Sequence, residues 1–333
     1  MGKHANQSGL VQHRMAEKEH AQFVERPPFP RALNVELSNV CNHSCQFCAY
    51  TLMEREHGSM DVTKLEKWLV EAHSLGARDL GLHSGAEPFA SRYLEHFTGY
   101  AKQVGYEYVY ISTNGSLAVP ARMKKVIDAG IDSIKFSINA GDRETYKRVH
   151  GKDDFDKVMS HVRFASEYRG DRAKPYLAVS FVETEDNRHT VEALKASLEP
   201  LVDEFLSFPA LNQSGQLAGN GERAWEEAKI CPIPFNKVHI SWEGFVRGCC
   251  NDYENLLAIE DINEMSLEEA YYSERYQSWR RQHLQNQLQG TLCQNCKYDT
   301  QTPVQPLNSD LYFRSHKSDR GPKVSHSVKI HRK

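Results

Sequence analysis

The amino-acid sequence predicts an α/β protein whose larger part is a parallel sheet covered by helices. Six strand-like segments alternate with helix-like segments between residues 32 and 208, an order typical of repeated βα units. A Gly- and Asn-rich segment at 212–223 then separates a second region of different texture. Six units are too few for a closed eight-stranded barrel. Periodicity therefore leaves two architectures open, an open, partial (βα)6 barrel and a doubly wound sheet.

Each expected element has a local reason. The strands are short apolar or alternating runs, expected at 32–37, 79–83, 106–111, 131–138, 176–182 and 204–208. The helices carry apolar residues at helical spacing, and they are expected at 61–76, 91–104, 120–129, 154–168 and 191–198. The first of these helices ends at a glycine, Gly76, and the third begins with a proline, Pro120, which are common helix boundaries.

The second region, 223–300, is expected to be a small domain of its own. Segments 237–241 and 245–249 alternate like strands and flank a Trp-Glu-Gly turn, which predicts a β-hairpin. Helices are expected after it at 265–272 and 273–284.

Both ends of the chain are expected to lie outside these two domains. Residues 1–30 are polar and then proline-rich, which is typical of an extended arm packing on the domain surface before the core at 31–222. Residues 301–333 are basic, with seven Lys and Arg against one Asp from Tyr312 onward. We expect this segment to be a flexible, solvated tail, and nucleic acid is not an expected partner.

The overall composition is that of an ordinary globular protein. The chain has 333 residues, of which 40% are hydrophobic and 26% charged, with a net charge of −3. No apolar run approaches the length of a membrane-spanning helix, so no membrane contact is expected. The first residues have no apolar stretch typical of a secretory signal. We therefore expect a cytoplasmic protein.

The most informative motif follows the first expected strand. Cys41, Cys45 and Cys48 form a C-x3-C-x2-C run. Three thiolates in one loop can hold three irons of a [4Fe–4S] cluster and leave the fourth iron open to a ligand. A tetrahedral zinc site would need a distant fourth residue. A group of core cysteines is the remaining alternative.

This spacing resembles the signature of the radical S-adenosylmethionine (SAM) enzymes. In that family the open iron binds the methionine end of SAM, and an electron from the cluster cleaves SAM to a 5′-deoxyadenosyl radical. The resemblance implies a partial (βα)6 barrel, and so it decides between the two architectures that periodicity allows. It also implies that active-site groups lie at the carboxyl ends of the strands.

The resemblance extends to residues that contact SAM in the family. Residues 84–88, Ser-Gly-Ala-Glu-Pro, are similar to the Gly-Gly-Glu-Pro motif. There Gly85 would allow close backbone approach, and Glu87 would accept a hydrogen bond from the SAM ammonium. The motif departs from the family pattern because it has one glycine. The other SAM contacts that the resemblance implies are Phe47, Ser112, Asn114 and Ser137.

A second group of cysteines occurs in the C-terminal region. Its members are Cys231, Cys249, Cys293 and Cys296, with Cys250 adjacent to Cys249. The residues alone allow a zinc ribbon. The pattern also resembles the SPASM/twitch extension of radical SAM enzymes, which implies one auxiliary [4Fe–4S] cluster on four thiolates. Cys250 is then left over as an alternative ligand, a packed thiol or a hydrogen-atom donor.

A cluster with four protein ligands cannot bind SAM, so we expect it to transfer electrons or position the substrate. The cysteine spacing over about residues 33–300 resembles the aminocyclitol (butirosin-type) radical SAM dehydrogenases. In such a reaction the radical takes a carbinol hydrogen, a proton leaves, and the auxiliary cluster accepts an electron to give a ketone. This reading implies a small sugar or cyclitol-like substrate and a flavodoxin or ferredoxin-type reductant.

Three alternatives stay open. One is a redox-neutral epimerase with Cys250 as hydrogen donor. Another is a peptide-modifying enzyme, ranked lower because only about 30 residues precede the core. The third is a zinc- or iron–sulfur-binding module without activity, against which Glu87 and Ser137 at strand ends argue. The general base is not assigned; candidates near strand ends are His43, Tyr50, His83 and Tyr93.

Overall fold

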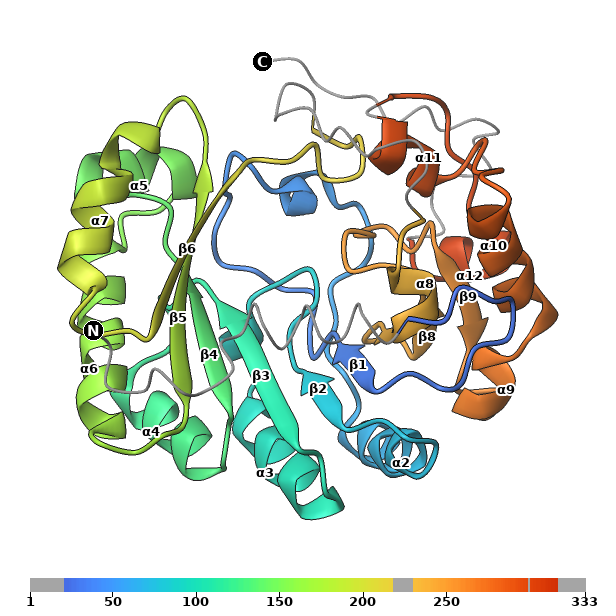
Figure 1. Ribbon diagram of the computed structural model, residues 1–333, viewed down its shortest axis with the longest axis horizontal. Helices are drawn as coiled ribbons and strands as arrows, with labels where there is room; N and C mark the ends of the chain where they lie inside the picture. The colour runs from blue at the N-terminus through green and yellow to red at the C-terminus, as the bar shows by residue number, and fades with distance from the viewer. Residues whose placement is uncertain (1–20, 218–229, 299, 317–333) are drawn as a thin grey trace.

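A computed structural model describes residues 21–217, 230–298 and 300–316 of the chain (Figure 1). Within these residues the strands form one mixed sheet of nine strands in the order β6-β5-β4-β3-β2-β1-β7-β8-β9. The strands are β1 (Ala32–Val35), β2 (Asp79–Gly81), β3 (Tyr108–Thr113), β4 (Ser133–Ser137), β5 (Tyr176–Glu183), β6 (Glu204–Pro209), β7 (Lys237–Ile240), β8 (Phe245–Arg247) and β9 (Ala258–Asp261).

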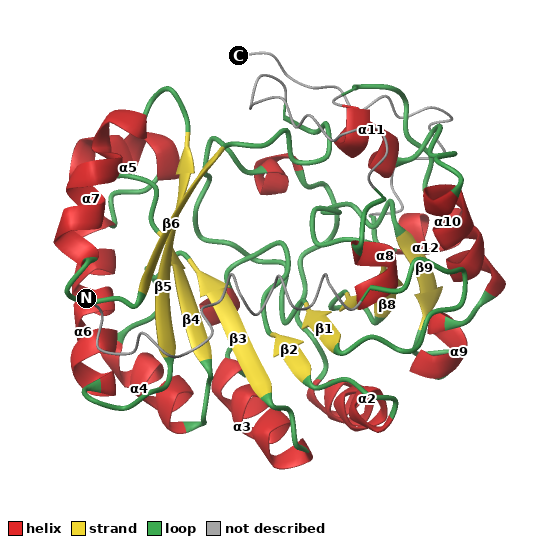
Figure 2. Cartoon of the chain, viewed as in Figure 1, coloured by secondary structure: helices red, strands yellow, loops and turns green. Residues whose placement is uncertain are grey.

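The first six strands are all parallel and carry helices on their outer side (Figure 2). The helices are α2 (Val62–Ser74), α3 (Leu94–Val104), α4 (Pro120–Asp128), α5 (Arg143–His150), α6 (Phe155–Arg169) and α7 (Val191–Leu198), with short 3-10 turns at Ala49–Leu52, Pro88–Ala90 and Arg188–Thr190. This arrangement confirms the predicted open, partial (βα)6 barrel. All six expected strands and all five expected helices of this part are present.

Local sequence explains where these helices begin and end. The Asp61 side chain accepts a hydrogen bond from the Lys64 amide and caps α2, and Asp142 caps α5 through the Thr145 amide. Gly105 ends α3 in the left-handed conformation, with φ of 114°. The inner faces of the helices bury apolar side chains against the sheet, which is the core of the domain.

The C-terminal region continues the same sheet instead of standing apart from it. Strand β7 pairs in parallel with β1, and β8 and β9 then add antiparallel. The hairpin expected at 237–249 is therefore confirmed as β7 and β8, whereas β9 was not predicted. The helices of this region are α8 (Ile233–Asn236), α9 (Leu267–Tyr271), α10 (Glu274–Leu284), α11 (Leu292–Tyr298) and α12 (Ser309–Arg314). Helices α9 and α10 agree with the expected segments.

A buried ion cluster joins the two regions. The Arg55 guanidinium lies 2.7 Å from a Glu36 carboxylate oxygen and 2.9 Å from Glu243, and all three side chains are largely buried. Arg247 lies 3.4 Å from the same Glu36 oxygen. Because Glu36 follows β1 and Glu243 lies in the β7–β8 turn, these charges fix the C-terminal hairpin to the strand that precedes the cysteine loop.

The prediction of a flexible tail from residue 301 is wrong for the part that the structure describes. Residues 309–314 form α12, whose Leu311 is buried and packs with Phe245 and Ala258. Asn308 caps this helix through the Leu311 amide, a signal present in the sequence. Residues 317–333 lie outside the described residues, as does the expected domain boundary at 222–223.

The described part of the expected N-terminal arm packs on the C-terminal region. The Phe23 ring lies 5.3 Å from that of Phe235, and the Tyr271 hydroxyl donates a hydrogen bond to the Pro28 carbonyl. Residues 1–20 lie outside the described residues. No helix in the described segments has the length and apolar character needed to cross a membrane.

Candidate active site

The three cysteines of the first motif lie on the loop that follows β1 and line one cavity of about 230 Å³. The Cys41 amide donates to the Tyr50 hydroxyl at 2.8 Å, which holds the start of the loop. Burial raises the pKa of the Cys41 thiol to about 12 and that of Cys45 well above its ordinary value. Thiols in such a place become thiolates when a metal supplies the compensating positive charge.

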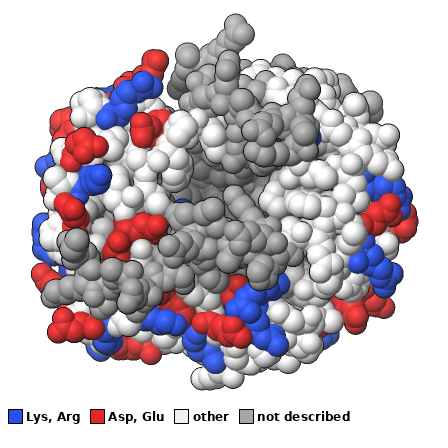
Figure 3. All heavy atoms as spheres, viewed as in Figure 1, with Lys and Arg blue, Asp and Glu red and all other residues white. Residues whose placement is uncertain are grey.

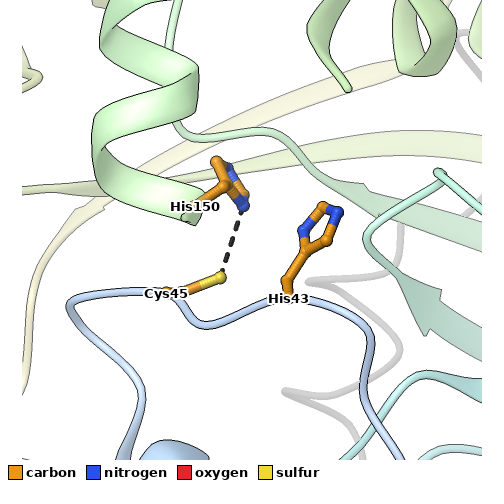
Figure 4. Close-up of side chains that lie close together, drawn as sticks. All are labelled: His43, Cys45 and His150. Atoms are coloured by element: carbon orange, nitrogen blue, oxygen red, sulfur yellow. Dashed lines mark hydrogen bonds between the residues drawn. The ribbon is translucent and has the colours of Figure 1, made fainter. Parts of the chain in front are cut away.

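Two histidines lie beside these thiols (Figure 4). Donor atoms of His43, Cys45 and His150 all lie within 4.8 Å of one another. The outer nitrogens of both rings are engaged elsewhere, since His43 Nε2 lies 3.3 Å from Asp154 and His150 Nε2 accepts from the Asn139 amide at 3.2 Å. On the inner side, His150 Nδ1 lies 3.3 Å from Cys45 Sγ, and the buried His43 Nδ1 has no hydrogen-bond partner among the described residues. The donor set fits a cluster held by three thiolates with one iron open.

The residues expected to contact SAM line the same cavity. Gly85, Glu87, Ser112, Asn114, Ser137 and Phe47 all contribute to its wall. Ser112 and Ser137 come from adjacent strand ends, with their hydroxyl oxygens 3.4 Å apart. Gly85 has φ of 70°, a left-handed conformation that favours glycine.

Glu87 also has a structural role that sequence did not predict. Its buried carboxylate accepts hydrogen bonds from the Thr113 hydroxyl at 2.6 Å, the Asn114 amide at 2.7 Å and the Phe89 amide at 3.0 Å. It thereby ties the end of β2 to the end of β3. Burial raises the pKa of Glu87, so a positively charged ligand beside it would favour its ionised form.

A second, larger cavity of about 470 Å³ adjoins the first. The two share wall residues that include Phe47, Cys48, His83, Ser137 and Tyr253. The larger cavity is closed on one side by Pro232, Asn236, Cys250 and Asn251 of the C-terminal region. The Tyr253 hydroxyl lies 3.5 Å from Cys48 Sγ, where the C-terminal region meets the cysteine loop.

The second group of cysteines is brought together beside this cavity. Hydrogen bonding with Cys250, burial and the neighbouring Cys231 raise the pKa of the Cys249 thiol. Burial, together with the neighbouring Cys231 and Cys296, raises the pKa of the Cys293 thiol. Cys249 packs against the apolar cluster of Leu256, Leu257, Leu292 and Val304, whereas Cys250 lines the cavity.

Two sequence profiles match the two parts of this arrangement. The radical SAM superfamily profile matches residues 35–194, and the SPASM iron–sulfur cluster-binding domain matches residues 231–297. The chain belongs to the radical SAM superfamily. It is a radical SAM enzyme with a SPASM domain, whose cofactors are SAM, a SAM-binding [4Fe–4S] cluster and an auxiliary [4Fe–4S] cluster.

Curated relatives match about half of this radical SAM enzyme or less. A probable GTP 3′,8-cyclase from Saccharolobus islandicus is 36% identical over 137 residues, covering 40% of this chain and 42% of the relative. One from Sulfurisphaera tokodaii is 31% identical over 177 residues, covering 52% and 54%. The chain thus spans about half the length of these relatives.

Solved structures share the fold over most of this chain. BtrN in complex with AdoMet and 2-DOIA is 20% identical with a TM-score of 0.58, covering 85% of this chain and 98% of BtrN. Streptococcus suis SuiB bound to precursor peptide SuiA is 13% identical with a TM-score of 0.63, covering 80% and 69%. The enzyme anSMEcpe with bound AdoMet is 14% identical with a TM-score of 0.59, covering 85% and 95%.

The four candidates for the general base lie in different parts of the structure. His83 lines both cavities of the radical SAM enzyme and contacts the edge of the Tyr110 ring. His43 and Tyr50 line the small cavity, where Asp154 and the Cys41 amide engage them. Tyr93 lies outside both cavities, at the start of α3.

Sequence reasoning missed inward-facing strand residues of the larger cavity, namely Asn34, Tyr110, Lys135, Lys237 and His239.

Proposed function

We propose that this radical SAM enzyme oxidises a hydroxyl-bearing carbon of a small molecule to a ketone, with the auxiliary cluster as electron acceptor. One observation carries this proposal. The larger cavity has Phe47 and Cys48 of the first cysteine motif in one wall, and Pro232 and Cys250 in another. The latter two are sequence neighbours of Cys231 and Cys249. A substrate in this cavity would therefore lie between the two cysteine groups.

The cofactors divide the oxidation between them. When bound, SAM and its cluster supply a radical that removes one hydrogen atom, and the auxiliary cluster accepts the one electron left after the hydroxyl proton departs. Cys41, Cys45 and Cys48 would hold the first cluster, and Cys231, Cys249, Cys293 and Cys296 the second. Among the four general-base candidates, His83 is the one that lines the larger cavity. We assign it the role of accepting the proton of the substrate hydroxyl.

The SAM contacts are proposed for the residues that share the small cavity with the first cysteines. Glu87 would accept a hydrogen bond from the SAM ammonium through Oε2. Among the described residues, the Asn114 amide is the donor to this oxygen. Ser137, Ser112 and Asn114 would bind the polar groups of the nucleoside and methionine, and Phe47 would pack beside the adenine. Gly85 would allow the close approach.

The fold of BtrN, whose structure was solved with AdoMet and 2-DOIA, supports a small-molecule substrate, because this chain covers 98% of BtrN. A flavodoxin or ferredoxin-type protein would supply the electron that starts each turnover. Peptide modification is ranked lower, although SuiB with its bound precursor peptide shares the fold.

The position of Cys250 favours a second candidate, redox-neutral epimerisation. Its thiol belongs to the wall of the larger cavity, where it could return a hydrogen atom to the opposite face of the substrate radical. No electron would then leave the substrate for the auxiliary cluster, and one electron from the reductant with one proton would return the Cys250 thiyl radical to a thiol.

Turnover in D₂O separates the two reactions. We would supply anaerobically reconstituted enzyme with SAM, dithionite and candidate polyols, using wild type and Cys250→Ala. Oxidation predicts a ketone in both proteins and no deuterium on the reacting carbon. Epimerisation predicts inverted product with one deuterium from the exchanged thiol in wild type, and its loss in the variant. Inverted, deuterated product without ketone would contradict the proposed function.

A further inference from the structure

The larger cavity has an unusual charge for a site that would take a neutral or amino sugar. Two lysines, Lys135 on β4 and Lys237 on β7, contribute to its wall, and the described wall residues include no Asp or Glu. An aminocyclitol carries an ammonium, which needs a carboxylate or several acceptors when it leaves water. The described wall of this cavity supplies lysines instead.

Polar groups at the floor of the cavity have no partner within the described protein. Both ring nitrogens of His239 and the Oδ1 atom of Asn34 are buried without a hydrogen bond, and the two side chains are 1% and 5% exposed. Asn34 and His239 are paired in register on β1 and β7. Buried polar groups are nearly always satisfied, so this pair indicates a ligand.

Gly81 gives these groups the room they need. It pairs with Asn34 on one side and with Tyr110 on the other. A methyl group at Gly81 would lie 2.8 Å from Asn34 Oδ1 and 3.0 Å from the Tyr110 ring. The Lys237 ammonium lies 3.3 Å from the Tyr110 hydroxyl. Polar groups from three strands, β1, β3 and β7, thus converge over a glycine at the floor.

We propose that the substrate is an anionic polyol, whose phosphate or carboxylate is bound at the floor of the larger cavity by Lys237 and His239, with Lys135 higher on the wall. The inference rests on the proposed function, because it takes this cavity as the substrate site. Burial and the charges of Lys237 and Arg247 lower the pKa of His239, so its neutral ring offers one donor and one acceptor. Asn34 would accept from a substrate hydroxyl.

Figure 3 shows basic and acidic side chains interspersed around the outer margin of this face, so this described margin does not carry one sign of charge. Ala178 on β5 is paired in register with Lys135 on β4 and with Glu204 on β6. An acidic residue therefore lies at the level of Lys135 in the sheet, which makes Lys237 the more direct probe of the two lysines.

Equilibrium binding to the reconstituted holoenzyme with SAM, without reductant, tests the inference. The probes are inorganic phosphate, D-glucose 6-phosphate, D-glucuronate, D-glucose and D-glucosamine, measured by calorimetry. We expect both sugar anions to bind at least about tenfold more tightly than D-glucose or D-glucosamine, since a hydrogen bond to a charged group is stronger than one between neutral groups. Tighter binding of D-glucose 6-phosphate would identify a phosphate as the anchor, and tighter binding of D-glucuronate a carboxylate.

Lysine variants test whether the anionic group is bound at the floor of the larger cavity. Lys237→Met and Lys135→Met keep the apolar stem of the side chain, and Lys195→Met removes an exposed lysine on α7 as a control. We expect Lys237→Met to lose about tenfold or more in affinity for the sugar anions, with the control unchanged. If a variant does not fold, the order of the wild-type affinities for the probes decides whether the cavity prefers anions.

The inference would be overturned if no anion binds, if D-glucosamine binds as tightly as the anions, or if Lys237→Met and Lys135→Met both bind them like wild type. Failure of the proposed oxidation would show differently. A bound anion would then give no ketone with reductant present, while the binding order would stand.

Discussion

His150 Nδ1 lies 3.3 Å from the sulfur of Cys45. The Asn139 amide donates to His150 Nε2, and an amide can only donate, so Nε2 is an acceptor and the ring proton lies on Nδ1. His150 therefore donates a hydrogen bond to a thiol of the radical SAM motif. The ring is held in place by stacking on Tyr146, with centroids 4.1 Å apart.

Removing this hydrogen bond should make the SAM-binding cluster harder to reduce. A donor to a ligand sulfur withdraws electron density and stabilises the reduced cluster. We expect His150→Phe, which keeps the ring stacking, to lower the cluster potential by about 60 mV, or roughly tenfold in the reduced fraction at a fixed potential. Redox titration followed by electron paramagnetic resonance measures it.

His161→Phe is the matched control, because His161 is also buried but bonds to the Gly115 carbonyl. Its potential should equal that of wild type, and His150→Gln, which can still donate, should recover part of the shift. An unchanged potential in His150→Phe with full iron content would show that the contact does not tune the cluster.

Glu87→Gln should weaken both SAM binding and the junction of β2 with β3. The carboxylate accepts from three protein donors, and an amide would turn N–H groups toward some of them. We expect about 1–3 kcal/mol less stability and about tenfold weaker SAM binding. Equilibrium dialysis with SAM and denaturant unfolding measure the two effects, with exposed Glu192→Gln as control. Wild-type affinity in Glu87→Gln would remove Glu87 from the SAM site.

Arg55→Met should destabilise the junction between barrel and C-terminal hairpin. It leaves Glu36 and Glu243 buried without their shared cation, and breaking such a pair costs about 3–5 kcal/mol. Arg143→Met removes an exposed pair with Asp153 and should change stability by about 1 kcal/mol or less. Denaturant unfolding of the holoenzyme compares them. Equal, small losses in both variants would contradict the structural role given to Arg55.

Docking of α12 should weaken as the pH rises. Burial opposes protonation of His316, but hydrogen bonds with Glu254 and the Tyr312 carbonyl raise its pKa above the ordinary 6.5. Because the folded-state pKa is raised, the stabilisation is full below about pH 6.5 and is lost as the pH rises through the folded-state value. Hydrogen-exchange protection factors of α12 should fall across that interval, and His316→Gln should abolish the fall. A pH-independent wild type would exclude the ion pair.

The sequence predicted the barrel well because its signals are local. Alternating apolar segments and caps such as Asp61 and Gly105 define elements without reference to the rest of the chain. Helix α5 was missed because its sequence, RETYKRVH, is mostly polar, and of its four buried residues (Thr145, Tyr146, Val149 and His150) only Tyr146 and Val149 are apolar. The cysteine motifs were found because metal ligands keep a fixed spacing.

Residues whose role depends on distant contacts could not be predicted. His150 is 105 residues from Cys45 in the chain, and Lys237 is 127 residues from Tyr110. Nothing in their local sequence distinguishes them from other His and Lys. The buried position of Arg55 was equally hidden, since an arginine in a polar segment is normally exposed.

The ratio of ketone to 5′-deoxyadenosine tests the central claim most directly. Wild-type enzyme with about eight irons per chain should form the two products in a ratio near one, because each hydrogen abstraction ends in one oxidation. Cys293→Ser/Cys296→Ser, with about four irons, should still form 5′-deoxyadenosine but lose the ketone. Ketone formed at the wild-type ratio by the variant would contradict an auxiliary cluster that accepts the electron.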